Sequence, residues 1–149
     1  MKFFLSFLLL LNLQSSIAQN LTGLWSGNFN NSRSSNPYIF YPVSFDITYD
    51  PDNNVISGIN RTISWDNIYS NFKIEGYFNK EKNYYYIEET QLIETNYSDK
   101  DYIIKNYFLL RFKGKNKLTG DCFCINFQTD FCKDKLIIYL KRNINSKKK

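Results

Sequence analysis

Apolar and polar residues alternate along much of the chain with a period of two residues, which is the spacing of a β-strand. The clearest run places single residues such as Ser44, Asp46 and Thr48 between six apolar ones: Ile39, Tyr41, Val43, Phe45, Ile47 and Tyr49. The turn-forming segment 50–54, Asp-Pro-Asp-Asn-Asn, follows directly. No long stretch carries apolar residues at helical spacing, so the pattern predicts an all-β fold.

Eight segments carry strand-like patterns and are separated mostly by short polar connections. The predicted strands are 22–30, 38–50, 55–64, 69–79, 84–95, 102–113, 117–127 and 132–142. An antiparallel meander of eight strands suits an up-and-down barrel, because closure leaves no edge strand unpaired. A two-sheet sandwich is the alternative, and the length of the strands favours the barrel. We expect one barrel domain over residues 19–142.

Two polar residues interrupt predicted strands at positions that could face the barrel interior. Glu89 shares a face with Ile87 and Ile93, so an inward Ile87 places Glu89 inside as well. An inward Arg61 could hold an acidic ligand through paired hydrogen bonds. The competing interpretation turns Arg61 outward as a solvated side chain.

Residues 1–18 have the features of a secretory signal peptide. Lys2 is followed by a leucine-rich run, and small residues occupy the positions that a signal peptidase recognises. The run is too short to span a membrane as a helix. We expect cleavage near Ala18/Gln19, a secreted or periplasmic location, and a basic disordered tail over residues 143–149.

Composition narrows the function classes. Aromatic residues make up 18% of the 149 residues, which favours strands over helices. The formal net charge of +5 is modest and forms no continuous nucleic-acid footprint. The chain has no histidine, which removes the commonest general base and most catalytic zinc sites. We therefore expect no catalysis, no cofactor, no metal and no nucleic-acid partner.

The start of the first predicted strand carries a family resemblance. Segment 21–27 reads Leu-Thr-Gly-Leu-Trp-Ser-Gly, and a Gly-x-Trp opening an eight-stranded meander resembles the lipocalin, fatty-acid-binding and avidin group of ligand-binding barrels. The resemblance implies that Trp25 closes one end of the core and that Arg142 packs across it. Biotin binding is not carried over, because the chain has only Trp25 and Trp65 where avidin-like sites use several more tryptophans.

The chain is also similar to small exported bacterial β-domains of unknown function. These share a Trp-x-Gly start, an Ile-x-Gly step, a glycine-bearing strand before a glutamate-rich one, and a cysteine near the C-terminus. The corresponding residues are Gly27, Gly58, Gly76, Glu88 with Glu89, and Cys132. The resemblance assigns structural roles to the three glycines and supplies no activity.

The three cysteines predict one disulfide in an exported protein. Cys122 and Cys124 lie two apart on one strand face, which is a poor arrangement for a bridge between them. We expect a Cys124–Cys132 bridge, with Cys122–Cys132 as the alternative. A remaining Cys122 thiol could pair with a second chain and form a dimer.

These observations predict a secreted binding module for a small apolar ligand or for a protein or glycan partner. The candidate ligand-binding residues are Arg61 and Glu89 as interior polar groups, and Trp65 and Tyr107 from the aromatic excess. The same aromatic residues would serve equally well as barrel core.

Two alternatives come from other classes. A carboxylate-pair hydrolase, similar in chemistry to a glycosidase, would use two of Glu75, Glu88, Glu89 and Glu94 facing one cleft. Glu88 and Glu89 cannot form that pair, because consecutive strand residues point to opposite faces. A small outer-membrane barrel would need a continuous apolar band on its outer surface.

Overall fold

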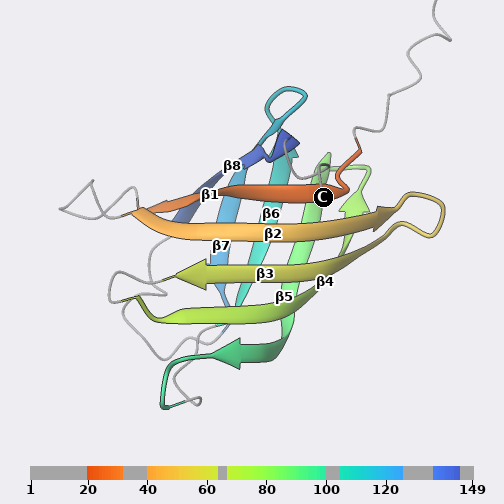
Figure 1. Ribbon diagram of the computed structural model, residues 1–149. Coiled ribbons are helices and arrows are strands. Elements are labelled where there is room, and N and C mark those ends of the chain that lie inside the picture. Colours follow the sequence, from red (N-terminus) through yellow and green to blue (C-terminus); the bar gives the residue numbers. More distant parts are fainter. Residues whose placement is uncertain (1–19, 32–39, 64–66, 100–104, 126–135, 145–149) are drawn as a thin grey trace, which may run out of the picture.

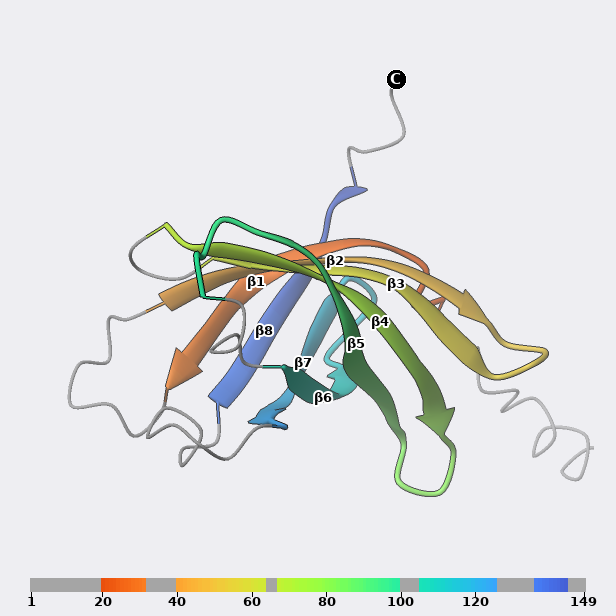
Figure 2. The same cartoon turned by 90° about the horizontal axis from the view of Figure 1, so that it is seen from below.

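A computed structural model of the chain describes residues 20–31, 40–63, 67–99, 105–125 and 136–144. They form a closed antiparallel barrel in which each strand pairs with its neighbours in the sequence and β1 pairs with β8 (Figures 1 and 2). The strands are β1 (Gly23–Asn31), β2 (Phe40–Asp50), β3 (Val55–Ile63), β4 (Tyr69–Asn79), β5 (Tyr84–Thr95), β6 (Asn106–Phe112), β7 (Lys117–Cys124) and β8 (Leu136–Arg142). The predicted eight-stranded meander is confirmed, and it closes as a barrel rather than a sandwich.

Several predictions fall on residues outside this description. They concern the signal peptide over 1–18, Trp65, Cys132 and most of the tail 143–149. The structure therefore does not test these predictions.

The barrel interior is filled mainly by apolar side chains that the period-two pattern sends inward. In β2, Val43, Phe45 and Ile47 are buried, whereas Asp46 and Thr48 are exposed. The core also contains Leu21, Trp25, Phe29, Ile56, Ile74, Tyr85, Ile87, Phe108, Leu110, Leu118, Cys122, Leu136, Ile138 and Leu140. Burial of this apolar surface is the main favourable contribution to folding.

One end of the barrel, called here the Trp25 end, is closed by Trp25 and its neighbours. The buried indole Nε1–H donates to the backbone oxygen of Leu21 at 2.8 Å. The guanidinium carbon of Arg142 lies 4.5 Å from the centroid of the Trp25 ring, and the same side chain donates to the backbone oxygen of Asn20. Phe112 packs edge-on against Trp25 with 5.8 Å between the ring centroids. The tryptophan thus has partners for both its apolar rings and its polar N–H.

Three glycines expected to be structural lie where neighbouring strands approach closely. A Cβ on Gly27, Gly58 or Gly76 would stand 1.7, 1.9 or 2.0 Å from a backbone oxygen of the adjacent strand. The sequence reasoning missed Gly120, where the corresponding distance is 2.0 Å. Glycine permits such backbone approach, which helps a sheet to curve until it closes.

We expect Gly27→Ala to lower the free energy of unfolding by about 1–3 kcal/mol. Gly27 lies opposite Leu140 on the β1–β8 pairing that closes the barrel, so the two strands must separate to admit a methyl group. Urea denaturation measures the change. Ser26→Ala is the neighbouring control and should alter stability by no more than about 0.5 kcal/mol. Equal stability of Gly27→Ala and wild type would contradict the close approach.

The second half of β5 departs from the predicted alternation. Ile93 was expected on the inward face with Ile87, but its side chain is 53% exposed. The pairing of β5 with β4 shifts register twice, leaving Thr90 and Ile93 as extra residues without a partner in β4. Each extra residue reverses the side-chain alternation. The prediction for Ile93 was therefore wrong, and β5 bends near its C-terminal end (Figure 1).

Candidate functional site

Three polar residues are buried among the apolar side chains of the described interior: Asn60, Glu89 and Asn106. Asn106 begins β6, whereas Phe112, at the other end of this strand, contacts Trp25. Asn106 and its hydrogen-bond partner Glu89 therefore lie toward the opposite end of the barrel, called here the far end. Asn60 is in the second half of β3, which also runs toward the far end.

Glu89 has one satisfied and one unsatisfied carboxyl oxygen. Its Oε2 accepts the backbone N–H of Asn106 at 2.6 Å and the Asn106 side-chain Nδ2–H at 3.0 Å. Its Oε1 is buried and has no hydrogen-bond partner among the described residues. An unsatisfied buried oxygen is costly, so it marks a place where another molecule could bind.

Burial raises the pKa of Glu89 to about 8, against the lowering by the two Asn106 hydrogen bonds and the positive charge of Lys105. The carboxyl group is therefore mostly protonated at neutral pH. Because Oε2 already accepts two N–H groups, the proton belongs on Oε1. Glu89 then presents an O–H donor to the barrel interior.

Asn60 presents a second donor. Its side chain is fully buried, and its Oδ1 accepts the hydroxyl proton of Thr62 at 3.1 Å. Its Nδ2 has no hydrogen-bond partner among the described residues. Asn60 and Glu89 lie on strands separated by β4 alone, and both side chains point inward. The interior thus combines an apolar lining with two hydrogen-bond donors that have no acceptor among the described residues.

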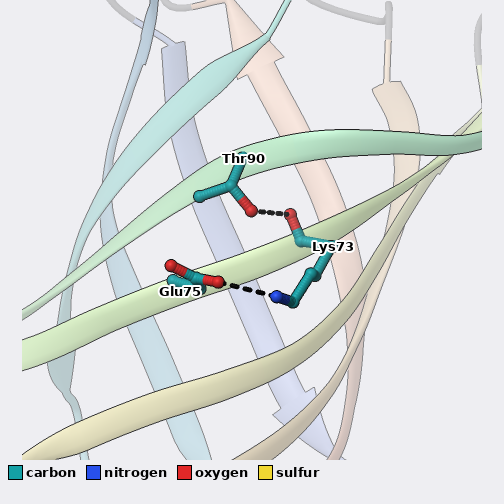
Figure 3. Close-up of polar contacts among 3 residues, drawn as sticks. All are labelled: Lys73, Glu75 and Thr90. Atoms are coloured by element: carbon teal, nitrogen blue, oxygen red, sulfur yellow. Dashed lines mark hydrogen bonds and ion pairs between the residues drawn. The ribbon is translucent and has the colours of Figure 1, made fainter.

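Glu89 lies directly before the bulge at Thr90. The pairing of β5 with β6 extends only to Glu88 opposite Tyr107, after which β5 continues along β4. Thr90 Oγ1 donates to the backbone oxygen of Lys73 at 3.3 Å, as Figure 3 shows, and Lys105 Nζ donates to the backbone oxygen of Thr90 at 2.8 Å. Glu89 therefore lies where β5 separates from β6, and bulges often occur beside functional sites.

The exposed surface beside the bulge carries an ion pair. Lys73 Nζ lies 2.8 Å from Glu75 Oε1, and both side chains are at least half exposed (Figure 3). Such a pair contributes little to stability, because water screens the charges. We assign it no role in the interior site.

Arg61 does not belong to the interior group. Its side chain is exposed, and its guanidinium carbon lies 4.7 Å from the centroid of the Tyr69 ring. Ile56 and Asn60 lie on the inward face of β3. Because neighbouring strand residues point to opposite faces, Arg61 points to solvent. The inward interpretation of Arg61 was wrong.

Tyr107 also lies on the outer surface, within a row of stacked rings. Its ring centroid is 5.8 Å from that of Tyr86 and 4.9 Å from that of Phe123, and Tyr86 stacks on Tyr77 at 5.3 Å. The four rings cross β4 to β7. Because each inner ring is covered by its neighbours on both faces, the row serves mainly as cross-strand packing.

The other candidate carboxylates point away from the interior. Glu75 and Glu94 are exposed, and Glu88 accepts the hydroxyl proton of Tyr86 at 2.7 Å on the outer face. Within the described residues, Glu89 is the only buried carboxyl group. A pair of inward carboxylates, which the hydrolase alternative needs, is not formed by these four residues.

The cysteines border the interior group. Cys124 is buried on β7 and lies opposite Asn106 in the β6–β7 register, while Cys122 is buried two residues earlier. Cys132 lies outside the described residues, so both proposed bridges, and a dimer through Cys122, stay predictions.

Sequence reasoning missed Asn60 and Asn106 as members of the site. A period-two count places Asn60 on the same face as Ile56, but the sequence left open which face of this strand points inward. Asn106 carried no comparable signal, because its role depends on the pairing of β6 with β5 at Glu89.

Comparisons with known proteins bear on the fold alone. No protein-family model matches the sequence, and no curated protein matches it. The structure is similar to a solved de novo designed fluorescence-activating β-barrel, with a TM-score of 0.58 and 12% sequence identity. The match covers 85% of this chain and 96% of the designed one. In the described residues, we find no helix with the length and apolar character needed to cross a membrane.

Proposed function

We propose that this chain is an exported binding protein that holds a small, mostly apolar molecule inside the far end of its barrel. The observation that carries the proposal is the pair of buried, unsatisfied polar atoms, Glu89 Oε1 and Asn60 Nδ2. Since both act as donors at neutral pH, the ligand should carry an oxygen acceptor such as a ketone, ester or lactone carbonyl.

The fold suits this role. An eight-stranded barrel is just wide enough to be filled by side chains or to hold one small ligand. Here the Trp25 end is packed with aromatic residues, whereas Glu89 Oε1 and Asn60 Nδ2 point into the far end. Two further buried polar atoms without a hydrogen-bond partner among the described residues, Asn71 Oδ1 and Arg142 Nε, do not belong to this interior group. Binding sites of this kind are apolar with a few well-placed polar groups. The likeness to a designed barrel described as fluorescence-activating supports the same capacity.

Export is supported by the sequence alone. Residues 1–18 have the charge, apolar run and small residues of a signal peptide. The Gly23-x-Trp25 opening, with its resemblance to the lipocalin and avidin group, is consistent with a secreted ligand-binding barrel.

The distribution of charge argues against the outer-membrane alternative. Arg61, Lys73 and Glu75 are exposed on the outer surface, while the interior is predominantly apolar. An outer-membrane barrel has the reverse arrangement, with an apolar exterior and a polar interior. The hydrolase alternative lacks an inward partner for Glu89 among its candidate glutamates.

We expect the mature protein to bind 2-undecanone at pH 6 and to bind it at least about tenfold more weakly at pH 9.5. The Glu89 donor disappears as pH rises through the pKa of about 8, and a carboxylate would then face the ketone oxygen. Isothermal titration calorimetry measures the affinity. Native mass spectrometry of protein from its own host would show whether a compound of this class is already bound.

Two matched comparisons test the assignment. Undecane has no acceptor, so its binding should be weaker than that of the ketone and insensitive to pH. Glu89→Gln keeps a donor at all pH values, so this variant should bind the ketone equally at pH 6 and pH 9.5. Equal binding of ketone and undecane by wild type would overturn the carbonyl assignment, and binding of neither would overturn the interior site.

A further inference from the structure

A pocket lies on the outer surface of the barrel, on β1, β7 and β8. In this region β8 runs between β1 and β7 (Figure 1). The volume of the pocket is about 390 Å³. The outward-facing side chains around it come from Ser26, Lys113, Lys117, Thr119, Tyr139 and Lys141. It is separate from the interior group and does not depend on the function proposed for that group.

The pocket concentrates positive charge. Lys117 lies directly opposite Lys141 in the β7–β8 register. The backbone N–H of Lys113 donates to the backbone oxygen of Lys117 at 2.8 Å, which places a third lysine beside the first two. The described lining includes no carboxylate. Like charges directly opposite each other destabilise a sheet, and a bound anion would relieve that repulsion.

The remaining lining adds an aromatic ring and two hydroxyl groups. Tyr139 is 50% exposed beside the lysines. Ser26 Oγ donates to Asn143 Oδ1 at 3.0 Å, and Thr119 Oγ1 donates to the backbone oxygen of Ile138 at 3.2 Å. Because the hydrogens of both hydroxyls are engaged, their oxygens present acceptors to the pocket. The pocket therefore offers cations, acceptors and an apolar ring together.

We infer that this pocket binds an acidic oligosaccharide. Carboxylate or sulfate groups of the sugar pair with Lys113, Lys117 and Lys141. Sugar hydroxyl groups donate to the Ser26 and Thr119 oxygens, and the C–H face of a sugar ring packs on Tyr139. A phosphatidylglycerol headgroup has no ring to pack on Tyr139, and a DNA backbone has no hydroxyl groups to donate to the Ser26 and Thr119 oxygens, whereas an acidic oligosaccharide supplies both.

The test is calorimetric titration of the mature protein with a penta-galacturonate and with a heparin-derived hexasaccharide. The triple variant Lys113→Gln, Lys117→Gln, Lys141→Gln should weaken binding of at least one of them by about tenfold or more. A control with the same loss of charge elsewhere, Lys73→Gln, Lys80→Gln, Lys82→Gln, should weaken binding less than about twofold. Equal losses in the two triple variants, or no binding by wild type, would overturn the site.

A second variant separates sugar recognition from general attraction between charges. Tyr139→Ala leaves the charge unchanged and should weaken oligosaccharide binding by about threefold or more, whereas Tyr77→Ala, at a similarly exposed tyrosine, should not. Circular dichroism checks that all variants remain folded. Tighter binding to vesicles containing phosphatidylglycerol or to oligothymidylate, with the same dependence on the three lysines, would replace the oligosaccharide by a lipid or nucleic-acid partner.

Discussion

Glu89→Gln should become progressively more stable relative to wild type as the pH rises from about 4.5 to about 8. The folded-state pKa of Glu89 is raised to about 8 from an ordinary value of 4.5, chiefly by burial. Between these values the folded wild type holds a proton that the unfolded chain has released. The stability of wild type therefore falls by roughly 1.4 kcal/mol per pH unit in this window.

The sign of the effect follows from the raised pKa. Below pH 4.5 the carboxyl is protonated in both states and contributes no pH dependence, and above pH 8 it is ionised in both and the loss is complete. A glutamine cannot ionise, and its amide can accept the two Asn106 hydrogen bonds as the protonated acid does. The variant therefore lacks this component of the pH dependence.

Urea denaturation of both proteins at half-unit steps of pH measures the difference, in which contributions from other titrating groups largely cancel. Glu75→Gln is the matched control, because Glu75 is an exposed carboxylate paired with Lys73. Its difference from wild type should vary by less than about 1 kcal/mol over the same range. Parallel stability curves for wild type and Glu89→Gln would mean that Glu89 is already ionised in the folded protein at neutral pH.

Trp25→Ala should lower the free energy of unfolding by about 3–5 kcal/mol. The substitution opens a cavity at the closed end of the barrel, because the Trp25 side chain is fully buried and contacts Phe112. It also removes the donor to the Leu21 oxygen and the ring beneath the Arg142 guanidinium. Denaturation followed by far-ultraviolet circular dichroism reports the loss without relying on tryptophan fluorescence.

Two further variants separate the contribution of the Trp25 N–H from that of its ring, and the loss at Trp25 from the general cost of truncating an aromatic residue. Trp25→Phe retains a ring but has no N–H, so its loss should be smaller than that of Trp25→Ala. Tyr139→Ala truncates a half-exposed aromatic residue on β8 and should cost no more than about 1 kcal/mol. A loss below about 1 kcal/mol for Trp25→Ala would show that the closed end does not depend on this residue.

The polar residues of the interior site belong to β3, β5 and β6, whereas the outer pocket is lined mainly by β1, β7 and β8. β7 and β8 send Leu118, Leu140 and Ile138 into the core while Lys117 and Lys141 face outward. The alternation of a strand allows one segment to build both surfaces independently. Variants of the outer lysines should therefore leave ketone binding unchanged, and Glu89→Gln should leave oligosaccharide binding unchanged.

The amino-acid sequence by itself determined the all-β class, the number of strands and most of their bounds, although the predicted bounds at 38, 64, 102, 127 and 132 lie outside the described residues. These follow from local properties, namely the period-two alternation and the turn-forming residues that end each run. The same alternation, counted from Ile87, correctly placed Glu89 inside the barrel. Local sequence is enough to show which segments form strands and which nearby residues share a face of a strand.

Tertiary structure alone decided where the alternation breaks and which polar groups meet. Ile93 turned outward because Thr90, an extra residue in β5 relative to β4, reverses the alternation before it, and a bulge is defined only by the partner strand. Asn106 joined Glu89 because β6 begins at the point where β5 leaves it. The direction of Arg61 likewise followed from the register of β3 within the closed barrel. Pairing register depends on contacts between distant segments, which local patterns do not encode.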